Sequence, residues 1–367
     1  MRTVAAFTDT YLPTVNGVSY TASTWRDRWC RRGGRMPLVY PAADGYQPED
    51  GEHPVGSVRF PWYEGFRLGR PAVPDAVERA APDVVHAHTP FALGLAAARL
   101  AARSDAPLIV SYHTPVSEYA GYVSDAFADA VGVAADRYER WFLNRADAVV
   151  APSQTAAERI DAEETPVYVV SNGVDTDRFR PVGEHAVTAF RDRYGLPDGP
   201  LVGYTGRHGR EKRLGDVLAA TAGLDAGVVI AGAGPATPEL RRRTAAREDV
   251  RLLGFLERNE LPAFYTALDA FAFPSPVETQ GLVALEAIAC GTPVVAADGG
   301  ALPETVDSGE TGCHFPVGDV RAFRTALRQT LARTDVLSDR CVARREQLAV
   351  ERAIDRLGDV YETVTHA

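Results

Sequence analysis

Short apolar runs alternate with longer amphipathic segments along the first half of the chain. The runs are rich in β-branched or aromatic residues and are bounded by Gly, Pro, Asp or Ser, which predicts strands at RTVAAFTD, RMPLVYPA, PDVVHAHT, APLIVSYHT, DAVVAPS and VYVVSNG. Helical patterns lie between them, at residues 15–32, 91–104 and 123–145. This alternation predicts a parallel sheet with helices on both faces.

A second series of the same kind follows the polar segment NGVDTDRFRPVGEHAVTAFRDRYGLPDGP. Its predicted strands are LVGYTGR, AGVVIAGAG, VRLLGFL, AFAFPS and PVVAADGG, and its predicted helices span residues 213–223, 259–268 and 281–290. From about residue 319 to 365 the chain reads as helical throughout.

We therefore predict an α/β protein with two doubly wound, Rossmann-like domains that face a cleft. The expected boundaries are an N-terminal domain at 1–175, an interdomain segment at 176–198 and a C-terminal domain at 199–345. A helix at 346–367 is expected to cross back to the first domain. Because ligands of open α/β sheets bind outside the carboxyl ends of the strands, residues that follow the strands are the candidates for a site.

The composition fits a globular, cytoplasmic protein of two domains. The chain has 367 residues, with 46% hydrophobic and 24% charged residues. Its start, MRTVAAFTDTY, reads as a strand rather than a signal peptide, and no apolar stretch reaches the roughly 20 residues of a membrane-spanning helix. A net charge of −10 argues against nucleic acid as a partner. Four cysteines without metal-ligand or disulfide spacing predict reduced thiols and no metal site.

Positive charge at the start of the second series suggests an anion site. Lys212 is the only lysine of the chain, and it follows Arg207 by five residues in GYTGRHGREKRLGDVL, a glycine-containing turn that leads into a helix. A helix N-terminus favours anions, and two flanking cations could clamp a diphosphate. The alternative is a solvated, arginine-rich helix start.

Two acids stand in the otherwise apolar stretch SPVETQGLVALEAIACGTPVV. Glu278 is expected on the loop after a strand, and Glu286 about a turn and a half into the next helix. The backbone N–H groups of Gly281, Leu282 and Val283 open that helix and are available to a phosphate. Alternatively, Glu278 is a capping acid and Glu286 an exposed helix residue, although a carboxylate among apolar neighbours needs partners.

Five motifs in one order resemble family 4 of the retaining glycosyltransferases, which adopt the GT-B fold. The spacing of the two glutamates resembles the family's signature, and GRHGREKR resembles its Arg and Lys diphosphate motif. VVSNGVDTDRF resembles its interdomain segment, FTDTYLPTVNGVSY its N-terminal glycine loop, and IVSYHTPVSEY its histidine motif. The resemblance covers almost the whole chain.

This resemblance implies a role for each candidate residue toward a nucleotide-sugar donor. Glu286 would accept both ribose hydroxyls, Glu278 would hold hydroxyls of the sugar, and Arg207 and Lys212 would neutralise the leaving diphosphate. His113 would contact the 6-hydroxyl of the sugar. The remaining donor contacts would come from Asn16, Gly17, Phe255 and Leu256, the last two by their backbone near the base. Gly17 could equally be a structural turn residue, and His113 a structural histidine. His86 and His88 lack a third metal ligand and are interpreted as structural or as lining the site.

The implied reaction is hexose transfer to a hydroxyl with retention and without a metal ion or other cofactor. A glycosidase-like double displacement needs two carboxyls about 5 Å apart at the reacting carbon, whereas one glutamate is assigned here to ribose. We therefore expect front-face attack, in which the leaving phosphate takes the acceptor proton.

Sequence cues to the acceptor favour a lipid or a lipid-linked glycan. VETQG and SYHTPVSEYAGY resemble enzymes that glycosylate diacylglycerol-type lipids, and TDTYLPTVNGV resembles lipid-linked mannosyltransferases. Residues 25–35, WRDRWCRRGGR, mix arginine and tryptophan in a way that suits an anionic membrane surface, although a helix with a buried tryptophan face fits equally well. Peripheral binding to the inner face of the cell membrane would follow. Aromatic residues are available to line an acceptor groove or a core, at Tyr119, Tyr122 and Phe127.

Other functions remain open at this point. A soluble sugar acceptor is the alternative within the family, and a nucleotide-sugar epimerase or a catalytically silent nucleotide-sugar-binding protein would share the fold. A nicotinamide dehydrogenase is poorly supported, because AGAGPAT has Thr237 where the third glycine of the dinucleotide fingerprint belongs.

Overall fold

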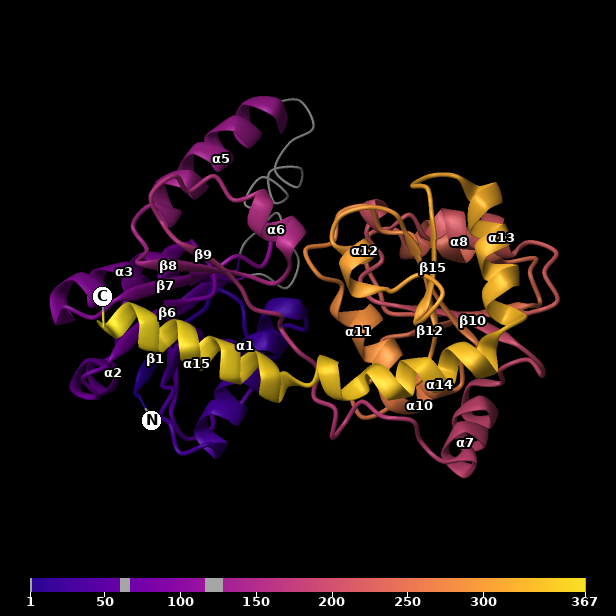
Figure 1. Ribbon diagram of the computed structural model, residues 1–367, viewed down its shortest axis with the longest axis horizontal. Helices are drawn as coiled ribbons and strands as arrows, with labels where there is room; N and C mark the ends of the chain where they lie inside the picture. Colours follow the sequence, from indigo (N-terminus) through magenta and orange to yellow (C-terminus); the bar gives the residue numbers. More distant parts are fainter. Residues whose placement is uncertain (1, 60–66, 116–127, 367) are drawn as a thin grey trace. The chain divides into compact units, whose positions relative to one another are not determined.

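The computed structural model describes residues 2–59, 67–115 and 128–366, and Tyr119, Tyr122 and Phe127 lie outside them. It divides into two compact units (Figure 1). The first unit consists of Met1–Asn172 and Val350–Ala367, and the second of Gly173–Ala349. The segment predicted to link the domains, 176–198, is part of the second unit rather than a separate connection.

The first unit is built on a parallel sheet with strand order β3-β2-β1-β6-β7-β8-β9. Its strands are β1 (Val4–Phe7), β2 (Leu38–Pro41), β3 (Glu52–Val55), β6 (Val84–Ala87), β7 (Leu108–Ser111), β8 (Ala148–Ala151) and β9 (Val167–Val169). A separate antiparallel pair is formed by β4 (Ser57–Arg59) and β5 (Arg67–Gly69). Every residue of the central strands β1, β6, β7 and β8 is buried, as expected for a parallel sheet covered on both faces.

Helices of the first unit come from both ends of the chain. They are α1 (Gly17–Arg31), α2 (Asp75–Arg79), α3 (Ala92–Ser104), α5 (Ala128–Leu143), α6 (Gln154–Glu158) and α15 (Val350–His366). In Figure 1 the C-terminal helix α15 runs beside α1, and the ring of Tyr361 packs edge-on against Trp29 at 5.2 Å. Residues from the two ends of the chain therefore pack together in the core of this unit.

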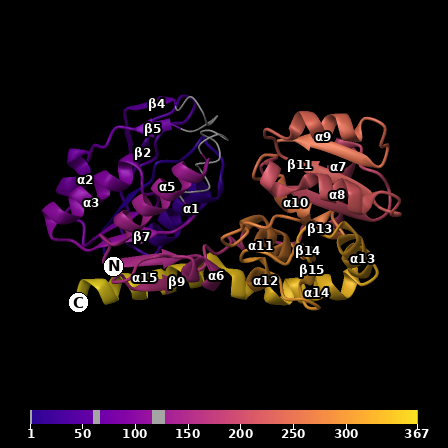
Figure 2. The ribbon, with the colours of Figure 1, turned by 90° about the horizontal axis from the view of Figure 1, so that it is seen from above.

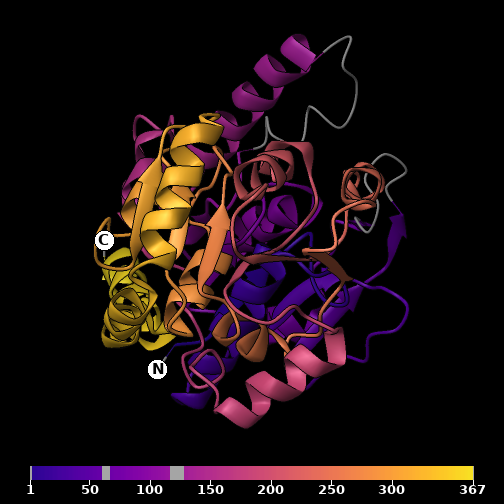
Figure 3. The same cartoon turned by 90° about the vertical axis from the view of Figure 1, so that its right-hand side faces the viewer.

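The second unit has a parallel sheet with strand order β12-β11-β10-β13-β14-β15. Its strands are β10 (Leu201–Thr205), β11 (Gly227–Ala231), β12 (Val250–Gly254), β13 (Ala270–Phe273), β14 (Val294–Ala297) and β15 (Gly312–Phe315). Its helices are α7 (Glu184–Tyr194), α8 (Leu214–Thr221), α9 (Thr237–Thr244), α10 (Leu261–Thr266), α11 (Leu282–Ala289), α12 (Leu302–Thr305), α13 (Val320–Leu331) and α14 (Thr334–Arg344), with 3₁₀ turns η1 (Arg210–Lys212) and η2 (Arg345–Leu348). The helices surround the sheet, as can be followed in Figure 2 and from the side in Figure 3.

Several predicted elements differ from the structure. Strands β3, β4, β5 and β15 were not predicted, because they are short and carry polar or glycine residues. The helical stretch expected from about 319 to 365 is broken into α13, α14, η2 and α15. The break before α15 coincides with the passage of the chain from the second unit into the first.

Candidate functional site

The second unit brings Lys212 and Glu278 together where its strand order reverses. β10 lies between β11 and β13, so the loops that follow β10 and β13 leave the sheet next to each other. The ammonium of Lys212, at the end of η1, pairs with the carboxylate of Glu278, with Nζ 2.5 Å from Oε1. The two side chains are only 19% and 14% exposed. The edge of the sheet therefore holds an ion pair that is largely screened from water.

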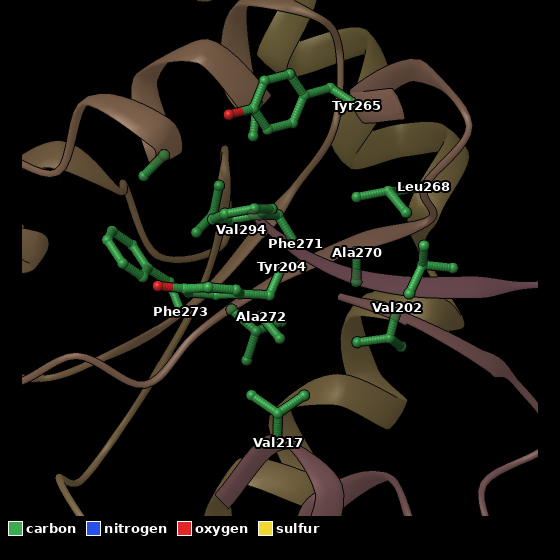
Figure 4. Close-up of a cluster of buried hydrophobic side chains, with 14 of the residues drawn as sticks. Val202, Tyr204, Val217, Tyr265, Leu268, Ala270, Phe271, Ala272, Phe273 and Val294 are labelled. Atoms are coloured by element: carbon green, nitrogen blue, oxygen red, sulfur yellow. The ribbon is translucent and has the colours of Figure 1, made fainter. Parts of the chain in front are cut away.

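Arg207 lies on the same loop after β10 and is also paired. Its Nη2 atom is 2.6 Å from Oε1 of Glu211, four residues later. The buried Tyr204 hydroxyl donates to the Arg207 carbonyl at 3.2 Å and ties this loop to β10. Figure 4 shows Tyr204 beside Phe271 of β13, with the two rings stacked at 6.0 Å. Both predicted diphosphate cations thus belong to an organised loop and not to a loosely solvated helix start.

Helix α11 starts next to this ion pair, and its first residues depend on a glycine. Gly281 has a φ of 83°, in the left-handed region, and a Cβ there would lie 2.9 Å from Phe273 and from Leu302. The first backbone bonds of the helix run from Ala284 and Leu285 to the Gly281 carbonyl. The N–H groups of Gly281, Leu282 and Val283 precede them, in the position that helix ends offer to anions.

Glu286 is buried in α11, which excludes the alternative of an exposed helix residue. Its side chain accepts a hydrogen bond from the Tyr265 hydroxyl at 2.9 Å. Burial raises the pKa of the Glu286 carboxyl to about 7, although the charge of Arg258 and the Tyr265 hydrogen bond both act to lower it. Burial of a carboxylate costs free energy, so we expect this one to serve a function. Tyr265 was not singled out from the sequence, because it lies 21 residues away.

The predicted base-binding residues follow β12 and differ from each other in exposure. Phe255 is 55% exposed, whereas Leu256 is buried in the core. Gly232, after β11, has a φ of 113°, and a Cβ there would lie 2.0 Å from the Gly206 carbonyl oxygen. The close packing of neighbouring loops therefore explains Gly232, the first glycine of AGAGPAT, without a bound dinucleotide.

The first unit stacks three imidazoles at the ends of β6 and β7. His86 stacks on His88 with ring centres 4.5 Å apart, and His88 stacks on His113 at 5.5 Å. Nδ1 of His88 lies 3.2 Å from Nε2 of His113, so one of these atoms donates and the other accepts. Burial lowers the pKa of His113 to about 4 and that of His86 to about 3, so the stack is neutral at physiological pH. A small pocket borders His88 and His113. His113 thus has a fixed orientation, and His86 and His88 help to set it.

The stack is anchored to the C-terminal helix by Tyr361. Its hydroxyl lies 2.6 Å from Nδ1 of His86, while the Ser111 hydroxyl lies 2.8 Å from Nε2. We expect Tyr361→Phe to lower the free energy of unfolding by about 1–3 kcal/mol, because a buried imidazole nitrogen loses its partner while the ring still packs on Trp29. Urea unfolding checks this, with Tyr168→Phe as a control for loss of a hydroxyl. Equal stability of the Tyr361 variant and the native protein would contradict this anchoring role.

The predicted glycine loop after β1 is held by side-chain hydrogen bonds. Asn16 caps α1: its side chain accepts from the Ser19 amide at 2.9 Å, and its Nδ2 donates to Thr10 at 2.8 Å. Gly17 is exposed and is the first residue of α1. The buried Asp9 carboxylate accepts from the Leu93 amide at 2.9 Å, a contact that links the loop to α3 and that was not predicted.

The two tryptophans of residues 25–35 face the core, which is the second of the two interpretations that the sequence allowed. Trp25 and Trp29 are buried at 1% and 4% exposure. Arg28 is buried and its Nε lies 2.9 Å from Glu351 of α15, and Arg32 pairs with Asp355 of the same helix. The tryptophans belong to the core, and these arginines hold α15 against α1.

The described residues contain neither a metal-binding group of side chains nor a membrane-spanning helix. Across residues 2–59, 67–115 and 128–366, no three His, Cys, Asp or Glu side chains are grouped so that they could hold a metal ion. No helix within the same ranges combines the length and hydropathy needed to cross a membrane.

Comparison with known proteins places this arrangement in a family. Residues 15–178 match the model of Glycosyltransferase Family 4, and residues 199–333 match that of Glycosyl transferases group 1. A GDP-mannose-dependent alpha-mannosyltransferase of Mycolicibacterium smegmatis is 31% identical over 362 residues, which cover 96% of this chain and 92% of that protein. The chain belongs to the family 4 glycosyltransferases. Its GT-B fold accounts for the two parallel-sheet units, and nucleotide sugars are the donors of such enzymes.

Two other relatives of this glycosyltransferase have names that indicate different products. Alpha-monoglucosyldiacylglycerol synthase of Streptococcus pneumoniae is 28% identical over 80% of this chain and 70% of that protein. Sulfoquinovosyl transferase SQD2 of Arabidopsis thaliana is 31% identical over 83% of this chain, which spans 62% of that protein's length.

Solved structures agree on the fold. Sucrose-phosphate synthase from Thermosynechococcus elongatus has a TM-score of 0.78, with 21% identity over 99% of both chains. HepE of Anabaena, in complex with UDP and glucose, has a TM-score of 0.78, with 20% identity over 99% of this chain and 100% of that one.

Proposed function

We propose that this glycosyltransferase moves a hexose from a nucleotide sugar to a hydroxyl of a membrane lipid or lipid-linked glycan, with retention at the anomeric carbon. The observation that carries the proposal is the Lys212–Glu278 pair beside Arg207 and the start of α11, all in the second unit. It offers positive charge and backbone N–H groups to a diphosphate, and a carboxylate to the hydroxyls of the attached sugar.

Each residue has a role in this reaction that its surroundings support. Lys212 and Arg207 stabilise the charge that develops on the leaving nucleoside diphosphate, so the reaction needs no divalent metal. Glu286 accepts the ribose hydroxyls from inside α11, and the exposed Phe255 offers its backbone to the base. In the first unit, Asn16 and Gly17 contribute to the donor or acceptor site, and His113 offers a fixed, neutral imidazole to a sugar hydroxyl.

The roles assigned to the two glutamates favour front-face attack over a double displacement as the route to retention. Glu278 is held by Lys212, and Glu286 is buried against Tyr265, so neither is placed as a covalent nucleophile. The bond from the anomeric carbon to the diphosphate oxygen breaks, and the acceptor oxygen bonds to the same face of the sugar. The acceptor proton passes to an oxygen of the leaving diphosphate.

A lipid acceptor is supported by the name of the diacylglycerol-type relative, and GDP-mannose as donor by that of the mannosyltransferase. UDP-sugars remain the other donor class, since UDP and glucose occupy a protein of the same fold. We place the reaction at the inner face of the cell membrane. This peripheral contact does not involve Trp25 and Trp29, which are buried.

A donor and acceptor screen tests the proposal. The purified chain is incubated with UDP-glucose, UDP-galactose or GDP-mannose and either membrane lipid extract or soluble sugars, and products are identified by mass spectrometry. We expect sugar transfer to a lipid fraction, and NMR should show that the product keeps the anomeric configuration of the donor. An inverted product would refute the mechanism, and transfer to soluble sugars alone would replace the lipid acceptor with a soluble one.

A further inference from the structure

The segment that carries the cations proposed to bind the diphosphate, residues 207–216, also contains carboxylates that pair with its arginines. Arg207 forms an ion pair with Glu211, and Arg213 forms one with Asp216, with Nε of Arg213 2.7 Å from Oδ2 of Asp216. Lys212 meets Glu278 from the loop after β13. The cations that the proposed function assigns to a diphosphate are thus each paired with a carboxylate.

Glu211 differs from the other carboxylates because the chain makes room for it. A Cβ on Gly209 would lie 2.0 Å from Oε1 and 2.3 Å from Oε2 of Glu211, so only glycine leaves space for the carboxylate in its present position. Gly209 has φ −85° and ψ 157°, a conformation that any residue can adopt. A Cβ at this position would therefore displace the Glu211 carboxylate without straining the backbone.

A phosphate oxygen and the Glu211 carboxylate need the same group. Both are anionic acceptors for a guanidinium, and Nη2 of Arg207 is already engaged by Oε1 of Glu211 at 2.6 Å. The pair is about one-third exposed on each side, so it is weak enough to be exchanged. Under the proposed function, an intact donor would compensate for this exchange through its sugar, whose hydroxyls would contact Glu278. The nucleoside diphosphate left after transfer has no sugar and gains nothing at Glu278.

We propose that Glu211 competes with the diphosphate for Arg207 and thereby favours release of the nucleoside diphosphate after sugar transfer. This inference rests on the proposed function, because it assigns the diphosphate to Arg207. Glu211 then lowers the affinity of the site for the diphosphate, and the sugar contact at Glu278 distinguishes the complete donor from the spent product. After transfer, the Glu211 carboxylate pairs with Arg207 again.

Three variants distinguish the effect of the Arg207–Glu211 ion pair from the effect of local net charge. Glu211→Gln removes both the carboxylate charge and the ion pair, and Gly209→Ala displaces the carboxylate without changing any charge. Asp216→Asn removes one charge from the first turn of α8 but leaves the Arg207 pair intact. Dissociation constants for UDP, GDP and the uncharged nucleosides uridine and guanosine are measured by calorimetry at one fixed ionic strength. Thermal unfolding of each variant verifies that it is folded.

We expect Glu211→Gln and Gly209→Ala to bind the nucleoside diphosphate about two- to fivefold more tightly, with unchanged nucleoside affinity. Product inhibition should strengthen by the same factor, and Asp216→Asn should match the native protein. Weaker or unchanged binding in Glu211→Gln would overturn the inference, because the carboxylate would then support Arg207 or be irrelevant to it. Equal tightening in Asp216→Asn, or none in folded Gly209→Ala, would also overturn it, since charge alone would explain the effect. A native protein that binds neither UDP nor GDP would contradict the proposed function itself.

Discussion

Replacement of Lys212 by alanine is expected to lower the rate of sugar transfer about 100- to 1,000-fold. The ammonium is the only lysine charge of the chain and is 19% exposed, so it acts on the leaving diphosphate with little screening by water. Initial rates at saturating donor measure the effect, because stabilisation of developing charge appears in turnover rather than in donor binding alone. Lys212→Arg keeps the charge and should recover part of the rate.

The matched control for Lys212 lies two residues earlier. Arg210 belongs to the same 3₁₀ turn and is exposed to solvent, so Arg210→Gln removes one positive charge without disturbing the Glu278 pair. We expect near-native turnover for this control. Lys212→Ala also leaves Glu278 without its ion partner, so melting temperatures must accompany the rates. A near-native rate in a folded Lys212→Ala protein would contradict the phosphate role.

The sheets could be predicted from sequence wherever the strands are continuous apolar runs. Residues 201–205 and 270–273 are fully buried in the structure, and such strands carry their signal in composition. β3 begins with Glu52, which accepts from the hydroxyls of Tyr11 at 2.6 Å and Tyr46 at 3.0 Å. The Tyr11 contact spans 41 residues, so no local pattern predicts that strand.

The sequence places each candidate residue on a strand end, loop or helix, but it does not predict which of them pair. Lys212 and Glu278 are 66 residues apart, and their contact follows from the adjacency of β10 and β13. The sequence allowed two interpretations of Trp25 and Trp29, a membrane-facing surface or a core, and their burial supports the core. A helix with tryptophans on one face suits either lipid or core, and the packing of α15 on α1 decides between them.

Glu286→Gln is expected to stabilise the free protein while weakening the nucleotide-sugar complex. Burial raises the pKa of the Glu286 carboxyl to about 7 from an ordinary value of 4.5, so the folded state binds its proton more tightly than the unfolded state. The folded state therefore loses stability as pH rises from about 4.5 to 7, by up to about 3 kcal/mol once the carboxyl is ionised. Glutamine removes this cost and still accepts the Tyr265 hydrogen bond through its amide oxygen. The gain in melting temperature should be small at pH 5 and largest at pH 8.

Glu286→Gln should lower the affinity for the donor, although it raises the stability of the free protein. A carboxylate can accept from both ribose hydroxyls, and loss of a hydrogen bond to a charged group costs about 1.5–3 kcal/mol, which corresponds to roughly 10- to 100-fold weaker binding. Affinity of the native protein should rise with pH through about 7 as the carboxylate forms, whereas that of the glutamine variant should stay flat. Titration calorimetry with UDP-sugars and GDP-mannose from pH 5.5 to 8 measures both trends.

Asp249→Asn provides the control of opposite sign. The Arg247 side chain lowers the pKa of the Asp249 carboxyl, so this acid contributes stability at neutral pH that is lost as pH falls. Its replacement should therefore lower the melting temperature at pH 7 and leave donor affinity unchanged. If Glu286→Gln instead bound the donor as tightly as the native protein, the ribose role would be lost. A buried carboxylate that costs the free protein stability and does nothing for the donor would then need another ligand to explain it.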